Sequence, residues 1–412
     1  MQWATAGVLA AEPLLDACLH DQRFDRQCED TRGEWLWKLI SQTASASEFR
    51  DPLLNALRTV NDDQDAYQLC DLALHFARSG DDAFRQQLYE FVGQRQIPDS
   101  PEIGEGQLLS LGGEEAFLFI ARLRGHHLAT AAWEWHDEAV IDAAIEDLGE
   151  SRVRELLTLS SEPEIRRFAT GWSENLRLPT DPESQRKANA QRMQAVTVSE
   201  VILAAQSEEQ NYWLRGWGMQ ASESDLDVVL EQIWKEHHPI TVANLLRVFL
   251  NRPLPRFDAR LISLCSHSDE NVQRRAFNVL CQNSHPLIRA YAISAIREQT
   301  PGIPAVGFLV KNFEQGDEQR ILDHVELLED PSVRHWMLMD LIKMLEENES
   351  ADSSKLGQIA YFHNPCPLCR FYAVRLLFRD GHVPTWLAEE CRFDAEEDCS
   401  SLAVKYRKTL PE

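Results

Sequence analysis

The residues best suited to chemistry lie near the end of the chain. His363 opens the segment HNPCPLC, in which Cys366 and Cys369 form a C-x2-C pair, and Cys391 and Cys399 follow. Paired cysteines at this spacing suit Zn2+, and the two later cysteines would complete four ligands. However, these two are eight positions apart, and Cys369 falls at an apolar position of a predicted helix. A core role is therefore favoured, and no metal-binding residue is predicted.

Histidines elsewhere in the chain are poorly arranged for binding or catalysis. His126–His127 and His237–His238 are adjacent pairs, and neighbours on a helix point about 100° apart, which does not suit chelation. The segment HDE at 136–138 could serve acid–base chemistry, but its acids are equally suited to capping a helix N-terminus. We expect no metal ligand or catalytic residue among them.

Sequence motifs of nucleotide-binding and hydrolytic enzymes are also missing. Gly104 and Gly106 lack the further glycine and the preceding strand of a phosphate loop. The chain contains no G-x-S-x-G and no H-E-x-x-H. Redox chemistry at the C-x2-C pair would require a βαβ context that the sequence does not indicate. The sequence therefore predicts no catalytic residue and no cofactor.

One aromatic segment is compatible with either packing or recognition. Trp213 and Trp217 are four positions apart in NYWLRGWGMQ, and Arg215 lies between them. Tryptophan and arginine are enriched at binding hot spots, but the same spacing also forms a packed helix face. Core packing is the favoured interpretation.

The charge of the chain restricts its partners. The 412 residues include 41 Lys and Arg against 66 Asp and Glu, which gives a net charge of −25. Such a chain is expected to repel phosphate backbones and anionic membranes, so neither nucleic acid nor a membrane is an expected partner. The acidity favours solubility, and it also suits a protein partner with a basic surface.

The cysteine content and the hydropathy predict a cellular location. The nine cysteines are scattered without the spacing of a disulfide framework, and most have apolar neighbours. The first residues lack the features of a signal peptide, and no apolar run is long enough to span a membrane. We expect a soluble protein of the cytoplasm.

Helical periodicity predominates along the chain, so an all-α fold is predicted. Residues 62–95 read as an αα-hairpin with a turn at 79–82. The segment RLPTDPESQRK at 177–187 has two prolines and little apolar content, which indicates a linker or a loose joint. The predicted domains are a helical-hairpin region at 1–176 and a repeat region at 188–412.

A recurring helix template is the clearest architectural signal. In residues 266–297, apolar side chains recur at offsets i, i+4, i+7 and i+8 in two successive segments, which places each set on one helix face. Further matches start at positions 165, 333 and 369, although Asp340 occupies the i+7 position of the segment starting at 333. The first set is Val272, Ala276, Val279 and Leu280; the second is Ile288, Ala292, Ala295 and Ile296.

The template resembles the second helix of HEAT repeats, roughly D-P-x-V-R-x-x-A-x-x-A-L, most clearly in residues 258–377. An arginine follows the first apolar position at Arg166, Arg289, Arg334 and Arg370, whereas Gln273 departs from the pattern. This resemblance implies an α-solenoid of stacked antiparallel helix pairs, with degenerate repeats in the N-terminal half. A compact helical bundle is the alternative.

The HEAT resemblance implies a non-enzymatic interaction scaffold or adaptor that uses a curved helical surface. Three alternatives stay open: a HEAT-like DNA glycosylase, a lyase similar to the HEAT-type proteins that attach bilin pigments, and an immunity or chaperone-like protein that binds a toxin or effector. The glycosylase would require a contiguous basic stripe, which the net charge of −25 disfavours.

Overall fold

The computed structural model describes residues 11–24, 32–43, 46–94, 96, 100, 102–129, 138–175, 182–207, 211–298, 305–324 and 329–407. Over these residues the chain forms helices and no strand, which confirms the predicted all-α class. None of the helices in these ranges is long and apolar enough to cross a lipid bilayer.

The chain divides into two compact units. One comprises residues 1–178 together with 389–412, and the other comprises 179–388. The division falls inside the segment 177–187, for which the sequence predicts a linker, and the described part of that segment begins helix α12 at Pro182. No feature of the sequence predicts that residues 389–412 group with the first unit.

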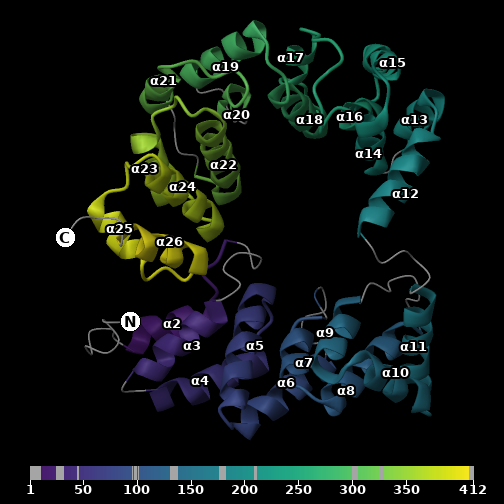
Figure 1. The fold of residues 1–412 in the computed structure, drawn as a ribbon, viewed down its shortest axis with the longest axis vertical. Helices are drawn as coiled ribbons and strands as arrows, with labels where there is room; N and C mark the ends of the chain where they lie inside the picture. The colour runs from purple at the N-terminus through teal and green to yellow at the C-terminus, as the bar shows by residue number, and fades with distance from the viewer. Residues whose placement is uncertain are drawn as a thin grey trace. The chain divides into compact units, whose positions relative to one another are not determined.

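The first unit contains the helices from α2 to α11 in chain order (Figure 1), together with α26 from the end of the chain. Its described helices are α2 (Ala11–Leu19), α3 (Arg32–Gln42), α4 (Ala46–Thr59), α5 (Asp63–Arg78), α6 (Asp82–Gln94), α7 (Glu105–Ser110), α8 (Glu114–His127), α9 (Glu138–Leu148), α10 (Glu150–Leu159), α11 (Pro163–Asn175) and α26 (Glu397–Arg407).

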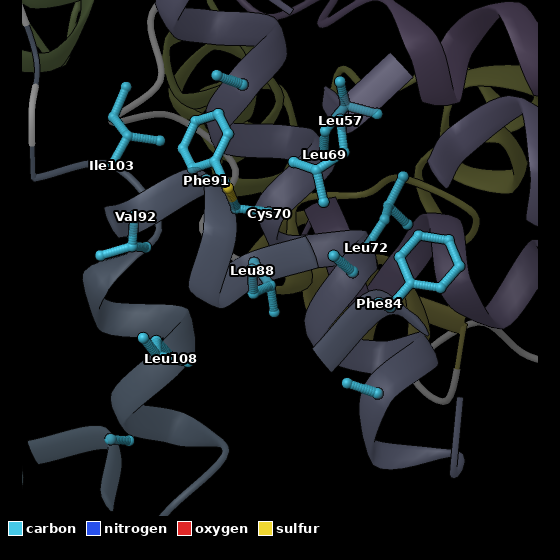
Figure 2. Close-up of a cluster of buried hydrophobic side chains, with 14 of the residues drawn as sticks. Leu57, Leu69, Cys70, Leu72, Phe84, Leu88, Phe91, Val92, Ile103 and Leu108 are labelled. Carbon is cyan, nitrogen blue, oxygen red and sulfur yellow. The ribbon is translucent and has the colours of Figure 1, made fainter. Parts of the chain in front are cut away.

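The predicted hairpin at 62–95 is confirmed as α5 and α6. Asp62 caps α5, because its carboxylate accepts hydrogen bonds from the backbone nitrogens of Gln64 and Asp65. Gly80, at φ 98°, supplies the left-handed residue that ends the first helix. Figure 2 shows apolar side chains of both helices in the continuous core of this unit, including Leu72 of α5 and Phe84 of α6.

The second unit has the same kind of organisation. Its described helices are α12 (Pro182–Gln194), α13 (Val198–Ala205), α14 (Trp213–Gln220), α15 (Glu223–Ile233), α16 (Pro239–Arg247), α17 (Leu261–Leu264), α18 (Glu270–Cys281), α19 (Pro286–Glu298), α20 (Val306–Leu309), α21 (Asp317–His324), α22 (Pro331–Glu347), α23 (Ser353–His363), α24 (Pro367–Arg379) and α25 (Thr385–Cys391), the last of which crosses the end of the unit.

Packing in both units is local along the chain. The strongly packed helix pairs in the described part include α5 with α6, α8 with α11, α16 with α18, and α23 with α24. Each of these pairs lies within three places in chain order, so these helices bury their apolar faces against near neighbours along the chain. Figure 1 shows successive helices lying side by side within each unit.

The predicted template faces are buried in α18 and α19. All four apolar residues of each set have little or no exposed surface. In α22 the prediction is wrong at its first position: Val333 is 39% exposed, whereas Met337 and Leu341 are buried. The reason is that α22 buries Leu338, Ile342 and Leu345 as well, so its buried face is rotated away from Val333.

Candidate functional site

The C-x2-C pair lies in the first turn of α24. Cys366 is the N-cap of this helix and Cys369 is its third residue, and both side chains are buried. The ring of His335, from α22, reaches the same place: its Nε2 lies 3.2 Å from the Cys369 Sγ. The three potential ligand atoms all lie within 4.8 Å of one another. The structure therefore joins the predicted pair to a histidine that sequence reasoning missed.

The other two cysteines form a separate pair. Cys391 and Cys399 are buried in the first unit, and a hydrogen bond between their side chains, together with burial, raises the pKa of the Cys399 thiol. The ligand cluster of the described residues comprises His335, Cys366 and Cys369 and includes neither of them. His363 is exposed at the end of α23 and also lies outside the cluster.

The remaining histidines considered in the sequence do not gather into a site. His126 and His127 lie in the last turn of α8, and His237 and His238 are exposed before α16. None of these four belongs to the metal-ligand cluster found among the described residues. Residues 136 and 137 of the HDE segment lie outside the described residues.

The tryptophan segment is a packed one. Trp217 is 3% exposed, and its indole nitrogen donates a hydrogen bond to the backbone oxygen of Val196 at 2.9 Å. Trp213 is half-buried in the first turn of the same helix, α14. The favoured core role is therefore correct for Trp217.

Tyr212, directly before this helix, belongs to an arginine cluster in the second unit. It is 72% exposed, and its ring lies 4.6 Å below the guanidinium of Arg247, the last residue of α16. Arg275, from the neighbouring helix α18, is close enough to Tyr212 and Arg247 for both to influence its pKa. Arg274 is the exposed arginine of the cluster. The cluster thus joins three helices.

Arg275 is an unusual member of this cluster. Its side chain is 8% exposed, and its Nε is buried without a hydrogen-bond partner. In the described part of the chain, the guanidinium forms neither a hydrogen bond nor an ion pair. Burial, followed by the charges of Arg247 and Arg274, lowers the pKa of Arg275 to about 10. A buried guanidinium that is ionised at pH 7 lowers the stability of the folded state unless an anion lies beside it.

The electrostatic surroundings of Arg275 contain no such anion. The ionisable groups that act on it are Arg247, Arg274 and Tyr212, and no carboxylate of the described residues is among them. Arg289, by contrast, pairs with Asp317 at 2.8 Å. The arginine cluster is therefore a local site of positive charge in a chain whose net charge is −25, and it can accept a carboxylate or phosphate.

Only part of this cluster is visible in the sequence. The adjacent pair Arg274–Arg275 is apparent, but Arg247 and Tyr212 come from other helices. The signal that could have revealed the site is the arginine in the position directly before Ala276, a small residue of the buried template face. A side chain at that position lies at the edge of the helix packing.

The chain was compared with protein-family models, with curated proteins and with solved structures, and none of the three comparisons finds a match. The geometry of the two clusters is therefore the basis for assigning a function.

Proposed function

We propose that the chain is a non-enzymatic interaction scaffold of the cytoplasm, built as a HEAT-like α-solenoid, that binds a partner protein through the arginine cluster. The local packing of helices supports the solenoid, because a helix pair that buries its face only against its neighbours is the repeating unit of such proteins. The buried cysteines of the described chain support a reducing compartment.

The observation that carries the proposal is the buried guanidinium of Arg275, which no acid of the described chain neutralises. A carboxylate on the partner would supply the missing charge beside the guanidinium. Hydrogen bonds to a desolvated arginine are stronger than those at a wet surface. Tyr212 would add apolar contact area, and tyrosine and arginine are enriched among the residues that dominate binding energy.

The surface that surrounds this carboxylate on the partner is proposed to be basic. The scaffold has a net charge of −25, so long-range attraction favours a partner of opposite charge and speeds association. The arginine cluster then fixes the register of the complex by accepting one acidic group. Affinity should fall as ionic strength rises, because salt screens the long-range attraction.

The proposal is tested by affinity capture with mass spectrometry, using the full chain and two variants. Arg275→Met removes the guanidinium and keeps most of the side-chain volume. Arg297→Met is the matched control, because Arg297 is exposed in the same unit and pairs with Glu298. We expect one stoichiometric partner to bind the wild type and the control, and to bind Arg275→Met at least tenfold more weakly.

Three outcomes would contradict the proposal. A partner that binds all three proteins equally would show that the arginine cluster is not the binding site. Duplex DNA bound at moderate salt and lost in Arg275→Met would favour the nucleic-acid alternative over the protein partner. Turnover of a small molecule without any protein partner would favour an enzyme.

A further inference from the structure

We infer that His335, Cys366 and Cys369 form a zinc site that joins α22 to α24. The ligand set consists of two cysteine sulfurs and one histidine nitrogen within 4.8 Å of one another. This inference is independent of the arginine cluster, which lies on α14, α16 and α18. It also differs from the four-cysteine arrangement suggested by the sequence, because the third ligand is a histidine from another helix.

The spacing of the ligand atoms fits zinc. Zn–S bonds of about 2.3 Å and Zn–N bonds of about 2.0 Å at tetrahedral angles place neighbouring ligand atoms roughly 3.5–3.8 Å apart. The His335 Nε2 to Cys369 Sγ distance of 3.2 Å and the limit of 4.8 Å for the whole group bracket this range. Small side-chain rotations therefore suffice to surround the ion. The soft thiolates favour Zn2+ over Mg2+ or Ca2+.

Both cysteines lie at the start of α24. Cys366 is the N-cap of α24, Pro367 occupies the first helical position, and Cys369 lies in the first turn. The helix dipole and the unpaired N–H groups at a helix N-terminus stabilise thiolates. Binding replaces two S–H protons by one Zn2+ ion, so two protons are released and the two thiolates balance the charge of the ion.

The site supplies three ligands from the described residues, and tetrahedral zinc takes four. Water fills the fourth position in protein sites with three ligands. Both cysteines are buried and His335 is half-buried. The ion would hold the start of α24 against α22, two helices that pack directly on each other.

The test begins with the full chain purified under reducing conditions. Zinc is measured by elemental mass spectrometry after dialysis against zinc-free buffer, and again after loading with zinc sulfate and removal of the excess. We expect about one zinc ion per chain in the wild type. Cys369→Ser and His335→Gln should hold less than a tenth of this amount. Cys265→Ser is the matched control, since Cys265 is a buried free cysteine outside the cluster.

A second measurement on the wild type covers the case in which a variant fails to fold. Zinc is removed with a chelator and the apoprotein is titrated with zinc while its cysteines are alkylated and mapped by mass spectrometry. Zinc should slow alkylation of Cys366 and Cys369 at least tenfold and leave Cys265 unchanged. Substitution with Co2+ should produce thiolate-to-cobalt charge-transfer absorption, which Cys369→Ser lacks.

The inference is overturned if the wild type holds no zinc after loading, or if Cys369→Ser and the wild type hold the same amount. Equal alkylation of Cys366 and Cys369 with and without zinc would also overturn it. Any of these results would leave the His335–Cys369 contact as a hydrogen bond of the helix interface.

Discussion

The side-chain nitrogen Nδ2 of Asn312 donates a hydrogen bond to the main-chain oxygen of Asn283, at a distance of 2.9 Å. The same nitrogen donates to the oxygen of Phe308 in the preceding turn, and the Asn312 Oδ1 accepts from the backbone nitrogen of His285 at 2.8 Å. One buried amide thus connects the end of α20 to the segment between α18 and α19. Asn348 forms an equivalent pair of bonds to Met344 and Val310 at the end of α22.

The first prediction concerns this amide. Asn312→Ala removes three hydrogen bonds and leaves a backbone N–H and two carbonyl oxygens to find other partners in a buried place. We expect the free energy of unfolding to fall by about 2–4 kcal/mol, measured by chemical denaturation. Asn271→Ala is the control, because Asn271 is exposed and should change the stability by less than about 0.5 kcal/mol. Equal losses would argue against the connecting role of Asn312.

A second prediction compares two glycines of α14. A Cβ added to Gly218 would lie 1.9 Å from the backbone oxygen of Val248, whereas one added to Gly216 would approach nothing closer than 4.0 Å. Gly218→Ala should therefore force the two segments apart and destabilise the protein by about 1–3 kcal/mol or more. Gly216→Ala should be neutral or stabilise by up to about 1 kcal/mol, because alanine is the better helix former. Thermal and chemical denaturation of both variants would check the contrast.

The third prediction concerns the small residue of the template on α19. Ala292 is fully buried, and Ala290, on the same helix, is exposed. Ala292→Leu should destabilise by about 1–3 kcal/mol through overpacking, and the same reasoning applies to Ala276 on α18. Ala290→Leu should leave the free energy of unfolding nearly unchanged. A neutral Ala292→Leu variant would show that the helices do not approach closely at this alanine.

The sequence predicts the fold class and the buried helix faces more fully than it predicts the candidate sites. The periodic offsets identify the buried faces of α18 and α19, because burial of a helix face depends on spacing within one segment. The sites depend on contacts between segments: His335 is 34 positions from Cys369, and Arg247 is 28 positions from Arg275. Local spacing contains no information on which helices meet, so neither cluster could be assembled from the sequence.

A fourth prediction concerns Asp340, the polar residue at a template position of α22. Burial raises the pKa of its carboxyl from 3.8 to about 7, and Lys343 opposes this shift. Between these values the folded protein binds more protons than the unfolded chain, so the contribution of Asp340 to stability falls as pH rises from about 4 to 7. Below pH 4 both states are protonated and the contribution vanishes.

Asp340→Asn removes the free-energy cost of ionising a buried carboxyl while keeping the shape of the side chain. Relative to the wild type, the variant should gain stability between pH 4 and pH 8 by an amount on the order of 3–4 kcal/mol. Denaturation at a series of pH values measures the difference, and the comparison at pH 4 serves as the internal control. A difference between the two proteins that is independent of pH would contradict the assigned cause.

The last prediction separates a binding role of Arg275 from a structural one. Replacing a residue that supports the fold should destabilise the protein. A buried cation without an acid beside it, by contrast, opposes folding, so its replacement should stabilise the protein. Arg275→Met fills the same space with an apolar chain and relieves the desolvation of the guanidinium. We therefore expect the free energy of unfolding to rise by about 1–3 kcal/mol at pH 7, while the affinity for the partner falls. Arg297→Met, at an exposed ion pair, should change neither quantity appreciably. A loss of stability in Arg275→Met would instead assign this arginine to the helix interface and remove the main support for the proposed binding site.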